Sequence, residues 1–205
     1  MFKRKILSKL EAWKRDERHK PLILRGARQV GKTTVVNEFG SQFDNYLYFN
    51  LEMSESVRLF EMDIPLNDLV NMLFASLGKS QKKGSTLIFI DEIQNSPKTI
   101  ALLRYFYEQR PDLYVIAAGS LLENLVDVNV SFPVGRVMYM ALRPCSFYEF
   151  LGAIGNTNLL AVLSQKPEYS IAFHEQLMHQ FNQYTIIGGM PEAVQHYAET
   201  QDIIA

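Results

Sequence analysis

Residues 26 to 34 read GARQVGKTT and connect an apolar segment, PLILR at 21 to 25, to a helix-like segment, VVNEF at 35 to 39. The stretch matches the pattern G-x-x-x-x-G-K-[ST], whose fixed positions are here Gly26, Gly31, Lys32 and Thr33. Glycine permits backbone angles and close approaches that a β-carbon would prevent, so the N–H groups of such a loop can surround a polyphosphate at a helix N-terminus. The stretch therefore predicts a phosphate-binding loop; a simple turn between strand and helix is the alternative.

A second motif contains two carboxylates. The segment LIFIDE at 87 to 92 places four apolar residues directly before Asp91 and Glu92, as expected for a buried strand that ends at a functional site. In P-loop ATPases an aspartate at this place holds Mg²⁺ together with the loop hydroxyl, and a neighbouring carboxylate can act on the attacking water. We therefore predict that Thr33 and Asp91 bind Mg²⁺ and that Glu92 orients or deprotonates water. The two carboxylates could instead cap the next helix, but the glycine loop upstream favours the catalytic interpretation.

The loop and the carboxylates together predict a site for Mg·ATP. Lys32 is expected to reach the β- and γ-phosphates. ATP is expected rather than GTP because the N-K-x-D element of guanine recognition is absent from the sequence. The loop residues predicted to bind the nucleotide are Gly26, Ala27, Arg28, Gln29, Val30, Gly31, Lys32, Thr33 and Thr34.

Short apolar segments of β type alternate with helical segments along the first 145 residues. Such alternation is typical of a parallel sheet with crossover helices. After Pro144 the β-type segments become rare and helical segments dominate, broken by Gly155, Pro167 and Gly188-Gly189. We predict an amphipathic basic N-terminal helix at 1–20, a P-loop core at 21–145 and a helical lid segment at 146–205. The predicted strands are 21 to 25, 46 to 51, 86 to 90, 114 to 118 and 134 to 142.

Composition narrows the class of protein. The lone cysteine, Cys145, has no partner for a disulfide, and no Cys/His spacing suggests zinc. The basic start lacks the uninterrupted apolar core of a signal peptide, and no apolar run approaches the roughly 18 residues of a membrane span. We therefore expect a cytoplasmic protein without a membrane partner. Three methionines are predicted to fill gaps in the core, namely Met53, Met62 and Met72.

The N-terminal helix leaves a choice between two interpretations. Residues 1 to 20 contain eight Lys or Arg against three Asp or Glu, a net charge of +5, whereas the other 185 residues carry −6. Phe2, Ile6, Leu10 and Trp13 recur at helical spacing, so the opposite face is positive. A basic face is commonly just solvated, which is the first interpretation. Binding to nucleic acid is the second, and the sequence offers no long basic stripe elsewhere to support it.

Six motifs in one order give the sequence a family resemblance. The chain resembles the AAA-type P-loop ATPases of prokaryotes, within the AAA+ superfamily, over roughly residues 15 to 195. The first two motifs are shared by many P-loop ATPases. The choice of family is narrowed by four features: Arg28, the glutamine after DEI, the GR pair and the final motif GGMPEA. The motifs are GARQVGKTT, FIDEIQ, AAGS, VGRV, SFYEFL and GGMPEA.

The resemblance implies a fold and three further site residues. The implied fold is a three-layer α/β sandwich with a parallel sheet of order 5-1-4-3-2, followed by a small helical lid. Ser120, the last residue of the motif AAGS, matches a sensor position near the γ-phosphate. Arg136 matches an arginine that stabilises transition-state charge in cis or from a neighbouring subunit, in which case the protein would be a homo-oligomer. Pro191 matches a proline that packs on adenine, or it simply begins a helix.

Departures from the family bear on function. No arginine follows Arg143, so the second sensor arginine of a conventional lid is missing, which favours a switch over a processive ring motor. Relatives tend to be about twice this long and to end in a second domain, so an effector domain is expected outside this chain. We predict an ATPase that drives a switch or remodels a partner. The alternative is an ATP-gated adaptor that binds DNA or protein with little turnover; a small-molecule kinase is disfavoured because the DE pair suits water activation.

Overall fold

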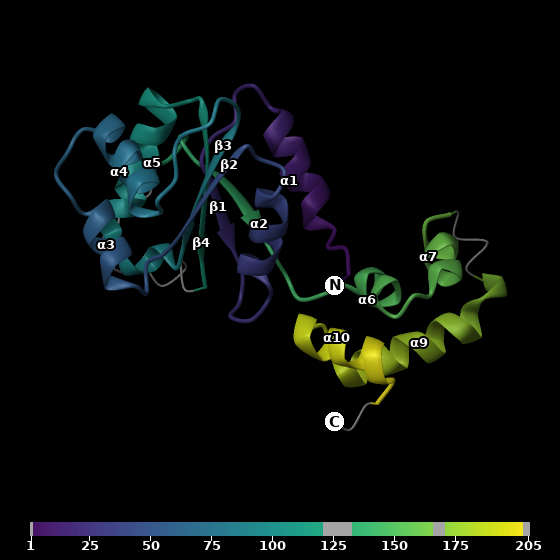
Figure 1. Cartoon of the computed structure of the whole chain (residues 1–205). Coiled ribbons are helices and arrows are strands. Elements are labelled where there is room, and N and C mark those ends of the chain that lie inside the picture. Colours follow the sequence, from purple (N-terminus) through teal and green to yellow (C-terminus); the bar gives the residue numbers. More distant parts are fainter. Residues whose placement is uncertain (1, 121–132, 166–170, 203–205) are drawn as a thin grey trace. The chain divides into compact units, whose positions relative to one another are not determined.

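The computed structural model describes residues 2–120, 133–165 and 171–202 (Figure 1). The chain divides into two compact units, each with its own apolar core. The sheet unit comprises Lys9–Ala27 and Lys32–Leu142, and the helical unit comprises Met1–Ser8, Arg28–Gly31 and Arg143–Ala205. The phosphate loop therefore contributes residues to both units. The division at 1–20, 21–145 and 146–205 stays a prediction.

The sheet unit is built on parallel strands. Every residue of the strand that carries the LIFID sequence is buried, as expected where helices cover both faces of a sheet. The order of the described strands is β2-β3-β4-β1-β5, which read from the other edge is the predicted 5-1-4-3-2. All pairings are parallel. The strands are β1 (Leu22–Arg25), β2 (Asn45–Asn50), β3 (Thr86–Asp91), β4 (Leu113–Gly119) and β5 (Met138–Ala141).

The fifth strand is shorter than the sequence suggested. It begins at Met138 rather than at residue 134, because residues 134–136 form a turn. Gly135 has φ +78°, a backbone angle that favours glycine, and Arg136 N donates to Pro133 O at 3.0 Å. The apolar character of 134 to 142 therefore overstated the length of the strand.

Helices cover both faces of the sheet and complete the three predicted layers. Figure 1 shows α3, α4 and α5 on one face and α2 on the other. Next to α2, the C-terminal part of α1 places Trp13 against Phe39, with ring centroids 6.3 Å apart. The helices are α1 (Ile6–Arg15), α2 (Lys32–Gly40), α3 (Ser54–Phe60), α4 (Leu66–Ser76), the short 3-10 helix η1 (Ile93–Asn95) and α5 (Pro97–Gln109).

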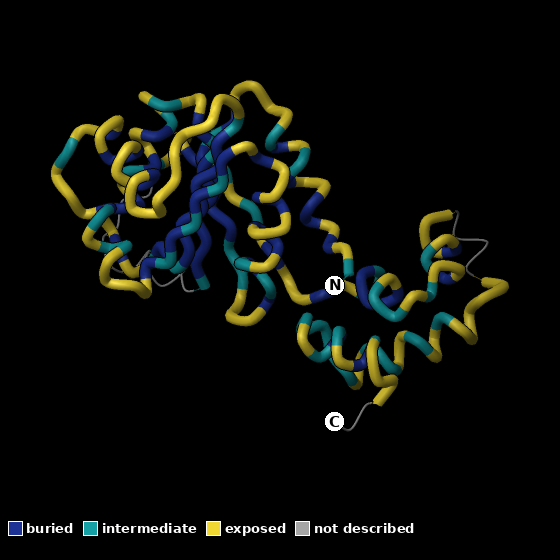
Figure 2. The backbone as a smooth tube through the Cα atoms, viewed as in Figure 1, coloured by how far each residue is buried: buried dark blue, intermediate teal, exposed yellow. Residues whose placement is uncertain are grey.

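The main core lies where the strands meet α3, α4 and α5. Its side chains include Phe60, Leu73, Ile88 and Leu103, all fully buried, and Figure 2 shows the central strands β1, β3 and β4 mostly in the dark blue of buried residues. Burying an aliphatic or aromatic side chain of this size stabilises the fold by about 1.5–3 kcal/mol. This core fixes the sheet that carries the loop and the two carboxylates.

The prediction that three methionines fill gaps in the core is wrong. Met53, Met62 and Met72 are 62%, 37% and 37% exposed. In α4 the buried positions are 66, 69, 70, 73 and 74, a stripe with helical spacing that leaves Met72 on the outer face. Met53 precedes α3 and Met62 follows it, where the chain turns at the surface.

The helical unit confirms the helical character predicted after residue 145. Its first helix begins with a capping box in which Ser146 and Glu149 satisfy each other's backbone N–H groups. Its core is aromatic: the Phe150 ring lies 5.5 Å from that of Tyr184 and 5.8 Å from that of Tyr197. No helix in the described ranges is long and apolar enough to cross a membrane. The helices are α6 (Phe147–Ala153), α7 (Thr157–Leu163), α9 (His174–Ile187) and α10 (Pro191–Thr200).

Leu103→Ala should destabilise the sheet unit by about 2–5 kcal/mol, because it leaves a cavity in the main core. The matched control is Leu77→Ala, since Leu77 belongs to the same unit but is 38% exposed, against 0% for Leu103. Urea unfolding, with the slope and midpoint compared, measures both. Equal losses for the two variants would contradict the placement of Leu103 in the core.

Candidate nucleotide site

The parallel sheet brings three chain segments together at the carboxyl ends of its strands, which form the edge of the sheet that carries the predicted site. Strand β4 lies between β1 and β3, and because all three run in the same direction, their carboxyl ends share an edge. The loop at 26–34 follows β1, Asp91 ends β3, and Ser120 follows β4. Open parallel sheets bind ligands at this edge, so the topology assembles the predicted site.

The phosphate loop turns sharply before α2. Gln29 and Gly31 have φ of 61° and 90°, and Lys32 begins α2, so the unpaired N–H groups of its first turn point back toward the loop. Lys32 Nζ donates to Gly26 O and Ala27 O, both at 2.9 Å. The ammonium is thus held over the loop by its own backbone, next to amides that favour anions. Within the loop, Arg28 and Thr34 are exposed.

Thr33 and Asp91 meet at the end of β3. Thr33 Oγ1 donates to Asp91 Oδ2 at 2.6 Å, and Glu92 N donates to Asp91 Oδ1 at 3.0 Å. Asp91 is only 3% exposed, and this burial raises the pKa of its carboxyl in spite of the hydrogen bond from Thr33. A hydroxyl and a carboxylate in contact are hard oxygen ligands, so this pair fits Mg²⁺ as predicted.

Glu92 has an unusual backbone. Its φ of 53° and ψ of 44° lie in the left-handed region, which costs a non-glycine residue free energy and is often found at functional sites. The left-handed turn breaks the alternation of β3 and redirects the glutamate at the end of the strand. Its Oε2 accepts from Gln94 Nε2 at 2.5 Å. The structure therefore gives the predicted water-activating carboxylate a hydrogen-bonding partner.

Ser120 presents a buried hydroxyl at the same edge. Its Oγ has no hydrogen-bond partner among the described residues, and Gly119 before it pairs with Arg25, the residue that leads into the loop. A buried polar atom normally has a partner, so an unsatisfied one here fits a ligand contact. The structure thus places Ser120 at the end of the strand beside the loop strand, and its role as a sensor stays a prediction.

Arg136 lies near the amino ends of the strands, whereas the predicted site lies at their carboxyl ends. It precedes β5, whose first residue, Met138, pairs with the first residue of β1, Leu22, whereas the loop follows the last residue of β1. Its Nε donates to Glu108 Oε1 at 3.0 Å in an exposed ion pair. Within one chain the structure therefore does not bring Arg136 together with Lys32, and the in cis alternative loses its geometric basis.

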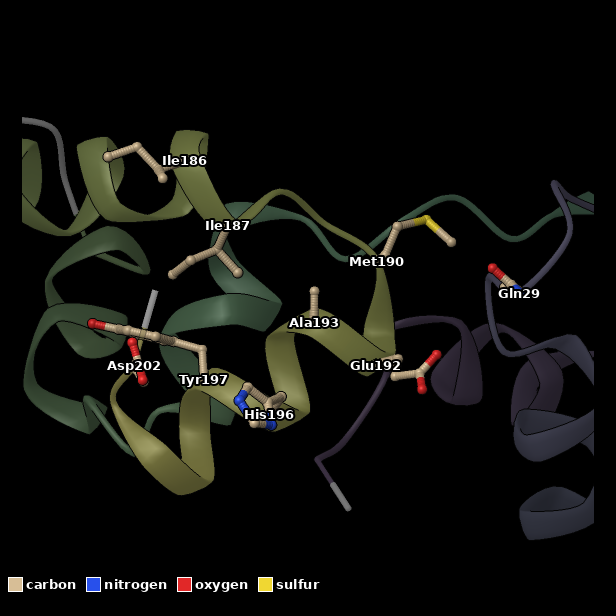
Figure 3. A pocket seen from close by; sticks show the side chains of 9 residues that line it. All are labelled: Gln29, Ile186, Ile187, Met190, Glu192, Ala193, His196, Tyr197 and Asp202. Carbon is tan, nitrogen blue, oxygen red and sulfur yellow. The ribbon is translucent and has the colours of Figure 1, made fainter. Parts of the chain in front are cut away.

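Pro191 belongs to the helical unit and begins α10. A β-carbon built on Gly31 would lie 3.7 Å from Pro191 Cγ, so the proline is also close to the loop. Beside it, a cavity of about 490 Å³ is lined by Gln29 and by side chains of α9, of α10 and of the residues flanking α10 (Figure 3). Both predictions for Pro191, a helix start and a base contact, fit this position.

Three residues at or beside the site were not assigned roles from the sequence. Gln94 helped to identify the family but received no role at the site, and its spacing from Glu92 was the available signal. Tyr48 on β2 approaches Asp91: burial and then the charge of that carboxylate raise the pKa of its hydroxyl. Arg4, which binds the Val30 carbonyl of the loop at 3.1 Å, lies 22 residues before Gly26, and no sequence pattern connects the two.

Comparison with known proteins identifies the family. A family model described as an AAA domain matches residues 18–151, more than half of the chain. The chain belongs to the AAA domain family. The match includes both motifs and all three strands that form the site, and it confirms the predicted resemblance to AAA-type P-loop ATPases. No curated protein matches the sequence.

Two solved structures share the fold of this AAA domain. The Walker-type ATPase PABY2304 of Pyrococcus abyssi gives a TM-score of 0.55 at 18% identity, covering 99% of this chain and 69% of that protein. PCH-2 of C. elegans gives a TM-score of 0.51 at 13% identity, covering 98% of this chain and 63% of that protein. At such identities the likeness shows the fold. Family and fold together support nucleotide binding by an ATPase-type domain.

Asp91→Asn should change the pH dependence of stability. Because burial raises the pKa of Asp91, the folded protein holds the proton more tightly than the unfolded chain, so the ionised carboxylate destabilises the fold at pH values above the ordinary aspartate range and not below it. The melting temperature of Asp91→Asn, measured relative to that of wild type, should therefore be higher at about pH 7 than at about pH 3. Each kcal/mol of unfolding free energy that the ionised Asp91 costs the wild type corresponds to a difference of about 2–4 °C.

The control for this variant has the opposite sign. The hydrogen bond from Arg110 lowers the pKa of Asp112, so its charge stabilises the fold above the ordinary aspartate range, and Asp112→Asn should lose a little melting temperature over the same interval. Melting curves at both pH values, recorded in the presence of a metal chelator, measure both variants. A relative loss in Asp91→Asn as the pH rises would contradict the assigned burial of Asp91.

Proposed function

We propose that this AAA domain binds Mg·ATP and hydrolyses it to ADP and phosphate. The observation that carries the proposal is the 2.6 Å hydrogen bond between Thr33 Oγ1 and Asp91 Oδ2, directly before Glu92. It brings the last turn of the phosphate loop and the end of β3 within contact distance. The predicted phosphate loop, the two proposed metal ligands and the proposed base therefore adjoin one another, and nucleotide hydrolysis needs such a set of groups.

The loop and Lys32 would hold the triphosphate. Phosphate oxygens are charged acceptors, and charge-assisted hydrogen bonds are roughly twice as strong as neutral ones. Lys32 Nζ would therefore exchange its bonds to the carbonyls of Gly26 and Ala27 for bonds to phosphate. Thr33 and Asp91 would hold the Mg²⁺, which when bound supplies positive charge next to the phosphates. The raised pKa of Asp91 makes a dication at this place the natural way to keep the carboxylate ionised.

Glu92 is proposed to act on the attacking water. A carboxylate at the end of β3 can accept the water's proton or fix its orientation. Gln94, hydrogen-bonded to Glu92 Oε2 at 2.5 Å, would hold that carboxylate in place until the nucleotide is bound. The hydroxyl of Ser120, for which the described residues supply no hydrogen-bond partner, would contact the γ-phosphate or the water, as the family resemblance implies.

The proposal includes a switch between nucleotide states. Residues 28–31 of the loop belong to the helical unit, whereas Ala27 and Lys32 belong to the sheet unit. Binding and hydrolysis at the loop would therefore favour different conformations of the domain in the ATP and ADP states. Pro191 and the cavity beside Gln29 would then receive the adenine base. A partner, either protein or nucleic acid, would respond to that change.

Arg136 enters the proposal through a neighbouring subunit. Arg136 lies near the amino ends of the strands, away from the loop of its own chain. Its ion pair with Glu108 is exposed, so breaking that pair to reach a second molecule would cost little free energy. A catalytic Arg136 therefore requires a homo-oligomer. Specific activity that stays constant over protein concentrations spanning monomer and oligomer would remove this role.

The alternative of a nucleic-acid adaptor is less well supported. Two cations of the basic N-terminal stretch are used within the sheet unit: Lys14 Nζ donates to Gln42 O at 2.6 Å, and Lys20 Nζ donates to Gly135 O at 2.7 Å. Lys9, Arg15 and Arg18 remain exposed. We therefore favour turnover and treat the exposed basic residues as the feature that tests the alternative.

Lys32→Ala and Glu92→Gln should separate binding from hydrolysis. Lys32→Ala should lose nucleotide affinity because the loop loses its ammonium. Glu92→Gln should keep affinity and lose turnover by about 10²–10⁴-fold, the usual contribution of a general base. Phosphate release and binding of a fluorescent ATP analogue measure the two properties. Equal phosphate release by wild type and Glu92→Gln would contradict the assignment of Glu92.

Assays with duplex DNA test the alternative that the protein is a nucleic-acid adaptor. The same assays with and without DNA, at two salt concentrations, should show no stimulation and no binding that depends on the exposed cations of α1 and the turn after it. The triple variant Lys9→Glu, Arg15→Glu and Arg18→Glu should then match wild type. DNA affinity that falls in this variant, with a reduced salt slope, would favour the adaptor instead.

A further inference from the structure

Arg4 is a buried arginine at the start of the helical unit. It is 4% exposed, although the sequence around it reads as a basic, solvated stretch. Its guanidinium donates three hydrogen bonds: Nε to Glu149 Oε1 at 3.0 Å, Nη1 to Val30 O at 3.1 Å and Nη2 to Arg143 O at 2.7 Å. All four residues belong to the helical unit. One side chain therefore joins three segments that are remote in sequence.

The carboxylate of Glu149 connects Arg4 to the first turn of α6. Its Oε1 also accepts from Lys5 N, and its Oε2 accepts from Ser146 N, both at 2.8 Å. Burial by itself raises the pKa of Glu149, but the hydrogen bonds from the backbone of Ser146 and Lys5 and from Arg4 outweigh it and lower the pKa. Glu149 is therefore ionised at neutral pH and serves at once as the partner of Arg4 and as the cap of α6.

At its other end Arg4 orients a peptide group of the phosphate loop. In a trans peptide the carbonyl and the following N–H point in opposite directions. Because Arg4 Nη1 holds the Val30 carbonyl, the Gly31 N–H is directed away from Arg4. Gly31 has φ +90°, and a β-carbon there would lie 3.6 Å from Arg4 Nη1. Arg4 thus helps to set the direction of an amide in the loop that is expected to cradle phosphate.

We propose that Arg4 is a positioning residue that couples the phosphate loop to the N-terminus of α6. Val30 and Glu149 share one guanidinium, so a ligand that fixes the Val30–Gly31 peptide also stabilises the capping box of α6, and loss of the capping box weakens the ligand by the same factor. The ligand in this coupling rests on the proposed nucleotide binding, whereas the link between loop and helix can be measured without it.

A simple buried ion pair would behave differently. Removing one partner of a buried pair is destabilising whatever the role of the pair, so loss of stability in Arg4→Ala would not discriminate. Arg4→Lys does discriminate, because an ammonium can keep the charge pair with Glu149 but cannot reproduce the planar fork that reaches Val30 O and Arg143 O. The double variant Arg4→Met with Glu149→Gln removes both charges together and leaves neither one unpaired.

The first measurement is hydrogen exchange of the nucleotide-free protein. Arg4→Lys should keep a melting temperature close to that of wild type, yet exchange in peptides covering 28–31 and 143–153 should become about tenfold faster, as expected for the loss of a charge-assisted hydrogen bond. The double variant should show the same two accelerated regions. Arg58→Lys, in the exposed part of α3, is the matched control and should leave both unchanged. Wild-type exchange of both regions in Arg4→Lys would overturn the proposal.

The second measurement adds Mg·ATP in a Glu92→Gln background, where bound ATP should persist. With Arg4 intact, ATP should slow exchange at 143–153; with Arg4→Lys, ATP should bind about tenfold more weakly and no longer slow it. ATP binding without protection of 143–153 in the Arg4-intact protein would overturn the coupling while leaving ATP binding intact. If that protein binds no ATP, the proposed function fails, and the nucleotide-free comparison alone decides whether Arg4 links loop and helix.

Discussion

The hydrogen bond between Thr33 and Asp91 depends on one constraint, the parallel pairing of β1, β4 and β3. Only parallel strands end at the same edge, and only the insertion of β4 between the other two leaves room for Ser120 beside the loop. Parallel strands must be joined by crossovers, and the helices that make them bury the apolar faces of β3 and β4. The chemistry at the edge and the hydrophobic core therefore have the same topological origin.

The site carries costs that the rest of the fold offsets. Asp91 is buried, Glu92 holds a left-handed backbone, and the Ser120 hydroxyl has no hydrogen-bond partner in the part of the chain that the structure describes. Each feature is costly for the fold by itself, and in the proposed nucleotide complex a metal, a phosphate or a water would offset that cost. Such local departures from good folding rules are expected at functional sites. Arg4 adds a link within the helical unit, since it joins Val30 of the loop to the capping box of α6.

Sequence reasoning predicted the parallel sheet and the phosphate loop from local patterns, and the family and the strand order from the resemblance to AAA-type ATPases. The glycine spacing fixes the loop, and LIFIDE marks both a buried strand and the point where it ends. It did not recover Arg4, whose partners lie 26, 139 and 145 residues away; only tertiary structure distinguishes it from the solvated basic residues around it. It also placed Met72 in the core, because composition says nothing about which face of a helix is buried. The place of Arg136 near the amino ends of the strands follows from the register of β5 with β1, which no motif specifies.

The most direct test of the account is a calorimetric titration of the purified protein with ATP at millimolar Mg²⁺, repeated with Asp91→Asn and with the metal chelated. We expect one binding event per chain for the wild type, with affinity that falls sharply both in Asp91→Asn and without Mg²⁺. An absence of binding heat for the wild type at any temperature, or a wild-type affinity that neither change affects, would contradict the claim that Thr33 and Asp91 together hold the metal of a bound nucleotide.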